Sequence, residues 1–224
     1  NSNNDLVCVY DYNINWHHSN YMAHTMATDS KGRIFIRLTG TGSPNIIVAN
    51  NDCSAAGAIN AQGGSTIAIN SSDEIFLASY TSNSIRRITD YDNKLSSLPS
   101  SGKPQSEWLV RNTEYNHVIR HMTPYEGCGS GNMRGFIDME FTDDGSMYGL
   151  DYYCNRMVKI TGPTGMTLHK QYPQSEGGGV GYHGIWTVEA TFGSRGSGNN
   201  QWDYSYGMGS KGNDLYVADS QNER

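Results

Sequence analysis

Several acidic side chains in this sequence stand at spacings that could bind a hard cation. Asp90, Asp92 and Asn93 occur together in Asp-Tyr-Asp-Asn, and oxygen ligands at alternate positions suit Ca²⁺. The other parts of an EF-hand loop are missing, because no glycine stands at its sixth place and no glutamate closes it. Asp and Asn also stabilise turns by bonding the backbone two residues on. Calcium binding and turn formation are therefore the two interpretations of this cluster.

Four cysteines, Cys8, Cys53, Cys128 and Cys154, could form two disulfides, and four cysteines allow three connectivities. Cys128 lies in the segment that leads into a hairpin repeat described below, and Cys154 lies in the turn after the second strand of the same repeat. We therefore predict that Cys128 pairs with Cys154 and, by elimination, that Cys8 pairs with Cys53. Disulfides are typical of oxidising, extracellular compartments.

The sequence carries no recognisable nucleophile or phosphate loop. Gly-x-Ser-x-Gly occurs only in broken form around Gly193 to Gly198, without the strand-turn-helix context of a hydrolase serine. The glycine-rich runs at 127–131, 177–181 and 193–198 lack the Lys-Ser/Thr of a phosphate loop. We interpret these runs as loops on one rim of the molecule.

Side chains suited to molecular contact are abundant, with four tryptophans and 15 tyrosines. Aromatic rings with a polar end suit stacking on sugars or contact with a partner protein. Asn70 opens an Asn-Ser-Ser sequon, which predicts a surface glycan. The aromatic contact candidates are Trp16, Trp108, Tyr125, Tyr172, Tyr182 and Trp202.

The composition of the 224 residues excludes several classes of protein. The formal charge is −6 and no long run of Lys or Arg occurs, so a nucleic-acid partner is not expected. The apolar runs, such as 46–49, are short, whereas a membrane span needs about 20 residues. Few windows have apolar residues at helical spacing, and the 26 glycines favour strands joined by tight turns. We predict a nearly all-β chain.

Four segments repeat one pattern, in which an alternating strand is followed by a polar turn and a strand that opens with an apolar-aromatic pair. They are residues 26–35, 67–76, 139–148 and 206–216. Each is predicted to be a β-hairpin, with its aromatic anchor buried. The anchors are Phe35, Phe76, Tyr148 and Tyr216. A third strand should follow a polar turn centred on Asn83, Asn155 and Asn222, because residues 79–89 run parallel in sequence to residues 151–161.

The last repeat resembles the NHL repeat of β-propellers through Val217-Ala-Asp-Ser-Gln-Asn-Glu-Arg224 and the preceding Phe192-Gly-Ser-Arg-Gly-Ser-Gly198. The best match is Phe192 to Arg224, and the pattern is looser elsewhere, since Leu38 and Ser79 replace its Asp. The resemblance implies a single β-propeller domain over residues 1–224, or a piece of a longer repeat array. It implies little about chemistry, because the repeat reports the geometry of a blade.

Two of the three steps between aromatic anchors are longer than the roughly 40 to 50 residues of one blade. Each long step either hides a degenerate blade, which gives six blades, or carries a long loop, which gives the four visible ones. Residues 107–110 and 116–119 could be strands in the first gap, and residues 185–190 could be one in the second. We expect six blades.

The two ends of the chain are complementary in sequence. Residues 8–13 align with residues 88–92, where a third strand runs into its turn, and Arg224 ends where a third strand is due. We predict that residues 6–13 form a strand beside Leu215 to Ala218, in the same chain or in a neighbouring copy. Such closure would cover an exposed strand edge.

The resemblance also suggests an enzymatic alternative, because some NHL-like propellers resemble the peptide-amidating lyase, in which histidines at the heads of inner strands hold zinc. His24 stands directly before such a strand, but Ser65 and Ile137 occupy the aligned places. A catalytic zinc needs three converging ligands. The positions predicted to converge on the axis are Thr25, Thr66, Asp138 and, in the fourth repeat, Tyr204 or Ser205.

We therefore expect an extracellular, non-enzymatic β-propeller that acts as a binding or structural module. Its expected partner is another protein or a second copy in a homo-oligomer or filament, and a glycan is the second candidate. No cofactor is expected apart from the calcium discussed above. The alternative is a metal-dependent propeller lyase or hydrolase, which would need a ring of ligands on the inner strands.

Overall fold

A computed structural model describes residues 22–39, 46–59, 65–78, 85–88, 128–129, 133, 135–171 and 180–224. These residues form fifteen β-strands and no helix, so the predicted all-β class is confirmed for them. Among them there is accordingly no helix with the length and apolar character needed to cross a membrane.

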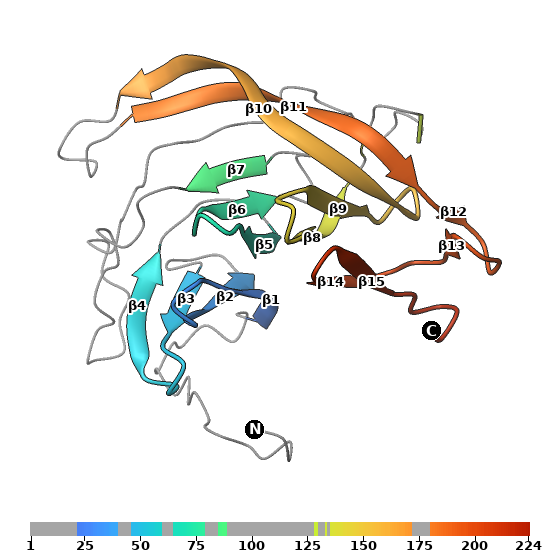
Figure 1. The fold of residues 1–224 in the computed structure, drawn as a ribbon, viewed down its shortest axis with the longest axis horizontal. Coiled ribbons are helices and arrows are strands. Elements are labelled where there is room, and N and C mark those ends of the chain that lie inside the picture. Colours follow the sequence, from blue (N-terminus) through green and yellow to red (C-terminus); the bar gives the residue numbers. More distant parts are fainter. Residues whose placement is uncertain are drawn as a thin grey trace.

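The strands form antiparallel sheets that follow one another along the chain (Figure 1). The first sheet contains β1 (Met22–Thr28), β2 (Ile34–Thr39), β3 (Ile46–Ala49) and β4 (Ala55–Ile59). The second contains β5 (Thr66–Ile69), β6 (Ile75–Ala78) and β7 (Ile85–Ile88). The third contains β8 (Phe136–Phe141), β9 (Met147–Asp151), β10 (Arg156–Gln171) and β11 (Val180–Phe192). The fourth contains β14 (Gly207–Lys211) and β15 (Asp214–Ala218), and a short parallel pair, β12 (Ser194–Arg195) and β13 (Gln201–Trp202), precedes it.

The hairpins predicted from the repeat are confirmed in all four sheets, and the turn residues explain them. Asp29 Oδ1 accepts hydrogen bonds from the backbone N–H groups of Lys31 and Arg33, at 3.1 and 2.8 Å. Asn70 Oδ1 accepts in the same way from Ser72 and Glu74, at 3.1 and 2.9 Å. A side chain that bonds the backbone two and four residues on fixes the reversal of the chain.

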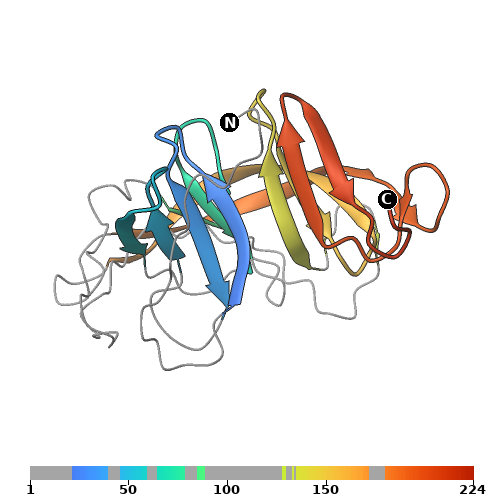
Figure 2. The same ribbon diagram turned by 90° about the horizontal axis from the view of Figure 1, so that it is seen from below.

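The first strands of the hairpins, β1, β5, β8 and β14, lie side by side in chain order, and Figure 2 shows the hairpin turns at the same end of the molecule. Neighbouring turns are joined directly. Ser30 donates to the Asp73 carboxylate through its backbone N–H at 2.8 Å and its hydroxyl at 2.5 Å. The backbone N–H of Asp144 donates to Asn213 Oδ1 at 3.0 Å. The sheets are therefore held in a fixed order by polar contacts as well as by apolar packing.

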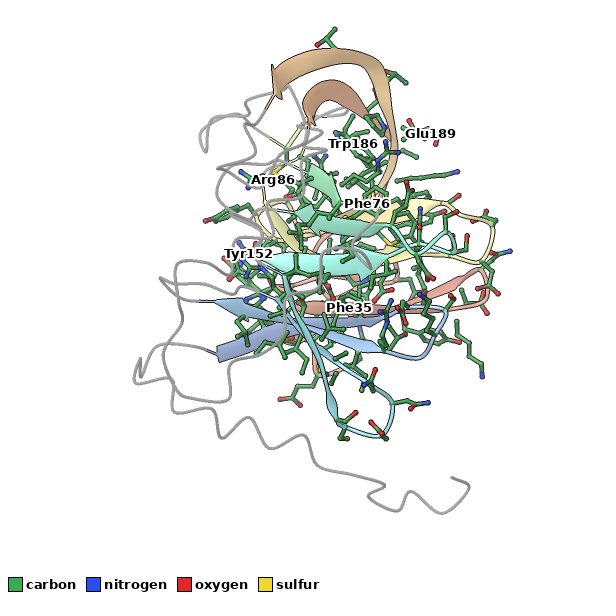
Figure 3. The ribbon with its side chains drawn as sticks, turned by 90° about the vertical axis from the view of Figure 1, so that its left-hand side faces the viewer. Phe35, Phe76, Arg86, Tyr152, Trp186 and Glu189 are labelled. Carbon is green, nitrogen blue, oxygen red and sulfur yellow. A yellow bond between two sulfur atoms is a disulfide. The ribbon has the colours of Figure 1, made fainter. Side chains whose placement is uncertain are left out.

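Two apolar clusters separate the first three sheets. Phe35 of the first sheet packs with Ile67 and other residues of the second, and Phe76 of the second packs with Met139 of the third and with Trp186. The rings of Phe76 and Trp186 have centroids 5.9 Å apart, and Figure 3 shows them together, with Phe35 in another layer. The aromatic anchors of the first two hairpins, Phe35 and Phe76, thus pack against the next sheet along the chain.

The second long interval between repeats contains no additional blade among the described residues. Residues 185–190, predicted as a strand of a hidden blade, belong to β11, which pairs with β10 from Met157 opposite Phe192 to Gln171 opposite Val180. The alternative of a long loop in this interval is also wrong for the described residues, because β10 and β11 occupy most of it. This alternating segment, which contains β-branched residues, pairs with β10. It therefore extends the third sheet and does not begin a separate one. The described sheets form an arc and not a closed ring (Figure 1). Residues 107–110, 116–119 and 6–13 lie outside the described residues.

Candidate functional site

Polar side chains on the first strands link one sheet to the next. Thr25 Oγ1 accepts a hydrogen bond from the backbone N–H of Ile67 at 3.1 Å. Thr66 Oγ1 donates to Asp138 Oδ1 at 3.0 Å, and the backbone N–H of Met208 donates to Asp138 Oδ2 at 2.7 Å. The structure therefore brings together three of the positions predicted to converge. Met208 makes the fourth contact in place of Tyr204 or Ser205.

The Asp138 carboxylate takes part in this ladder of hydrogen bonds between the first strands. Its Oδ1 also accepts from the backbone N–H of Met139 at 2.9 Å, so both oxygens are bonded and the side chain is buried. Burial raises the pKa of Asp138, and the hydrogen bonds from Met208, Met139 and Thr66 oppose that rise. A carboxylate that already satisfies three donors of the fold is a poor candidate for a metal ligand or general base.

A second carboxyl group, Glu140, lies two residues along β8 on the same side of the strand. Its Oε2 accepts from the Ser210 hydroxyl at 3.3 Å. Burial, with the negative charge of Asp138, raises the pKa of Glu140 to about 7. Glu140 borders a cavity of about 540 Å³ between β1, β5, β8 and β14. The other walls of the cavity are mostly apolar and include Met26, Ile67 and Phe141.

The two outermost sheets expose large side chains at positions that are buried in other copies of the repeat. Met26 of β1 is 65% exposed, whereas Ile67 and Met139 at the equivalent places are 2% and 0% exposed. Tyr216 of β15 is 59% exposed, whereas the anchors Phe35 and Phe76 are 0% and 5% exposed. The prediction that Tyr216 is a buried anchor is therefore wrong, and Tyr148 is only partly buried. The reason is positional, because no described sheet follows the fourth.

Four tyrosines gather where the turn between β9 and β10 meets the segment before β14. The ring centroid of Tyr152 lies 5.5, 5.4 and 5.2 Å from those of Tyr153, Tyr204 and Tyr206. The hydroxyl oxygens of Tyr152 and Tyr206 are 2.9 Å apart, and this hydrogen bond, with burial, raises the pKa of Tyr152 to about 12. The guanidinium carbon of Arg195 lies 5.0 Å from the Tyr204 ring centroid. No local sequence pattern predicts this cluster, because the two pairs of tyrosines belong to repeats that are far apart in the chain.

An Asp and an Arg five residues apart clamp the segment that leads into each of the last two hairpins. Arg156 Nε contacts Asp151 Oδ2 at 3.3 Å and its Nη1 donates to the carbonyls of Cys128 and Gly129 at 2.8 and 3.2 Å. Arg224 Nε contacts Asp219 Oδ2 at 3.0 Å. The guanidinium of Arg224 donates to carbonyls of residues 197, 198 and 201. This clamp is the structural role of the Asp and Arg in the repeated phrase.

Cys128 and Cys154 form a disulfide, with Cα atoms 5.4 Å apart, which is the pair predicted from the sequence. Cys53 is also disulfide-bonded, and its expected partner, Cys8, lies outside the described residues. Disulfide bonds are typical of an oxidising environment.

Asn70, the predicted glycan acceptor, lies in the turn between β5 and β6 and is partly buried. Its Nδ2 donates to Glu74 Oε2 at 2.8 Å, in addition to the turn hydrogen bonds of its Oδ1 described above. A glycan on Nδ2 would have to share this nitrogen with the Glu74 contact. N-glycosylation at Asn70 stays a prediction.

The remaining predicted site residues are dispersed or lie outside the described part of the chain. His24 is exposed on β1, and the described residues hold no group of three His, Cys, Asp or Glu arranged to bind a metal ion. Trp202 is partly buried and its ring covers Gly193, whose φ of 82° and close ring contact leave no room for a Cβ. Tyr182 lies in β11. The calcium candidates Asp90, Asp92 and Asn93 and the contact candidates Trp16, Trp108, Tyr125 and Tyr172 lie outside the described residues.

Comparisons with known proteins leave the resemblance to NHL repeats a prediction. No protein-family model matches the chain, and no curated protein sequence matches it. The chain is similar to a solved structure of a protein of unknown function from Bacteroides caccae, with a TM-score of 0.37 and 10% sequence identity. The alignment covers 91% of this chain and 62% of the Bacteroides protein. A likeness at this level supports no inference about fold or function.

Proposed function

We propose that this chain is a non-enzymatic β-propeller module that works by surface contact and assembles with further copies of itself through the open faces of its outermost sheets. The observation that carries the proposal is the pair of exposed positions, Met26 and Tyr216. At the first two junctions between sheets, an aromatic anchor of one sheet, Phe35 or Phe76, is buried with an apolar residue on the first strand of the next, Ile67 or Met139. Among the described residues, no sheet precedes the first one and no sheet follows the fourth.

The two end faces are expected to be complementary to each other. Inside the molecule, the face of one sheet that points along the chain packs on the face of the next sheet that points back. Phe35 against Ile67 and Phe76 against Met139 are examples of that junction. A copy that presents Tyr216 to the Met26 side of another copy would repeat the same contact. Such a contact is heterologous, and heterologous contacts produce rings or filaments. Large exposed apolar side chains at the ends of a repeat array favour this use.

The hydrogen-bond ladder on the first strands favours a binding function over catalysis. In a propeller enzyme the inner strands would supply metal ligands. Here both carboxylate oxygens of Asp138 accept hydrogen bonds from Thr66, Met139 and Met208. The Cys128–Cys154 bond and the Asn70 sequon support an extracellular location. A glycan bound by the exposed tyrosines is the second candidate partner.

Complementary variants test the proposal. Met26→Lys blocks one face and Tyr216→Lys blocks the other, and each places a charge at an exposed position. Analytical ultracentrifugation should show oligomers for the unchanged protein and monomers for each variant alone. An equimolar mixture of the two variants should form dimers and nothing larger, because each copy keeps one intact face.

Tyr153→Lys is the control, because Tyr153 is 42% exposed but lies in the turn between β9 and β10. It should assemble like the unchanged protein. A monomeric unchanged protein, or a mixture that stays monomeric, would contradict head-to-tail assembly. A metal ion that co-purifies stoichiometrically and is required for turnover of a substrate would favour the lyase or hydrolase alternative.

A further inference from the structure

The closest contact within the tyrosine cluster joins two sheets that are far apart in sequence. Tyr152 follows β9 of the third sheet, and Tyr206 precedes β14 of the fourth, 54 residues later. Their hydroxyl oxygens are 2.9 Å apart. The segment that carries Tyr206 is also held in place, because the backbone N–H of Tyr204 donates to Asn155 Oδ1 at 2.6 Å.

The two rings converge toward their hydroxyl ends. Their centroids are 5.2 Å apart with an angle of 49° between the planes, while the oxygens are separated by only 2.9 Å. The ring carbons next to the hydroxyl-bearing carbons belong to these converging ends of the two rings. Those ortho carbons are the positions at which two tyrosyl radicals join.

We propose that Tyr152 and Tyr206 form an oxidative cross-linking site, at which a peroxide-driven haem peroxidase joins the two rings by a carbon–carbon bond. Each phenol loses one electron and its hydroxyl proton to become a phenoxyl radical. The radicals couple between ortho carbons, and the two hydrogens on those carbons move to the oxygens, which restores both phenols. The two electrons and two protons removed reduce one hydrogen peroxide to two waters.

The surroundings of the pair suit this reaction. Tyr206 is 52% exposed, so an external oxidant reaches it without unfolding the protein. The hydroxyl contact holds the two phenol groups together while each loses its proton to water. Pre-oriented rings react with each other in preference to rings that must meet by diffusion. The product would tie the fourth sheet covalently to the third, as the Cys128–Cys154 bond ties a loop to the β9–β10 turn.

The cross-link goes beyond the assembly proposed above and uses different residues from the end faces. Its test treats the intact protein with hydrogen peroxide and a haem peroxidase, followed by reduction of disulfides and trypsin digestion. We expect the monomer to lose the mass of two hydrogen atoms and to gain dityrosine fluorescence. Mass spectrometry should find the tryptic peptide 135–156 joined to the peptide 196–211, with fragment ions that place the bond on Tyr152 and Tyr206.

Two matched variants decide which rings react. Tyr206→Phe should abolish the linked peptide, whereas Tyr204→Phe should retain it, although the Tyr204 ring centroid is 5.4 Å from that of Tyr152. Circular dichroism before treatment checks that both variants are folded. The proposal is overturned if Tyr206→Phe still yields the same linked peptides in the same amount. It is equally overturned if the dityrosine appears only in covalent dimers, or if peroxidase leaves the folded protein unmodified.

Discussion

At the scale of single residues, the main structural theme is the use of carboxyl groups to join neighbouring strands. Asp138 receives hydrogen bonds from its own sheet and from both neighbouring sheets. Within the described part of the chain, Glu140, on the same side of β8, has only the 3.3 Å contact with Ser210 to offset its burial. The two groups therefore differ in their roles, because one is a structural acceptor and the other is a buried acid beside a cavity.

Glu140 should make the stability of the protein depend on pH. Its pKa rises to about 7 in the folded chain, so the folded state binds more protons than the unfolded state above the ordinary glutamate pKa. This contribution to stability is complete below the ordinary value and is lost as the pH rises through about 7. Glu140→Gln, which stays neutral, should flatten the fall in urea midpoint over that range. The part of the slope that remains belongs to Asp138, whose pKa is also raised by burial. Identical slopes for the two proteins would contradict this assignment.

At the scale of elements, each of the last two hairpins is attached to its incoming segment by an Asp–Arg clamp. The Asp151 side chain is fully buried and that of Arg156 is 7% exposed, so the pair is shielded from water. The clamp explains why the phrase with Asp and Arg recurs in the third and fourth repeats. The second repeat has Ser79 and Ser84 at these places, and residues 79–84 lie outside the described part of the chain.

Removal of Arg156 should lower the unfolding free energy more than removal of Arg195, although the more exposed ion pair that Arg195 forms with its carboxylate is shorter. Arg156→Leu leaves Asp151 buried without its cationic partner and should lower the unfolding free energy by about 3–5 kcal/mol. Arg195→Ala is the control, because the Arg195–Asp203 pair is 3.0 Å long but its side chains are 62% and 30% exposed. Exposed pairs contribute about 0–1 kcal/mol. Urea denaturation followed by circular dichroism measures both, and equal losses would show that the clamp is not a buried pair in solution.

At the scale of the whole molecule, an arc of sheets is stabilised by contacts between neighbours and by covalent bonds between segments. In such an array each sheet depends on the next, so the outer sheets have fewer supporting contacts than the inner ones. The fourth sheet shows this clearly, because Tyr206 and Tyr216 are both more than half exposed. Oligomer formation and cross-linking are two means by which this sheet could gain support.

The disulfide between Cys128 and Cys154 should stabilise the chain by restricting its unfolded state. The two cysteines are 26 residues apart, and closing a loop of that order contributes about 2–4 kcal/mol. The double variant Cys128→Ser/Cys154→Ser should therefore unfold at lower urea concentration, with the fold retained in the absence of denaturant. Reduction of the unchanged protein should have an effect at least as large, because Cys53 is disulfide-bonded too. A double variant as stable as the parent would contradict this role.

The all-β class, the four hairpins and the bond between Cys128 and Cys154 were predictable from the residues alone, because these features depend on local turn chemistry and on short-range repetition. The sequence repeat also placed Thr25, Thr66 and Asp138 at equivalent positions, which the structure joins in one ladder. That residues 185–190 extend the third sheet is seen in the three-dimensional arrangement, since an alternating strand has the same sequence pattern whichever neighbour it pairs with. Likewise, Tyr216 and Phe35 occupy the same place in the repeat, and one is exposed while the other is buried. That difference, like the meeting of Tyr152 with Tyr206, depends on which sheet lies alongside, and no local sequence pattern encodes it.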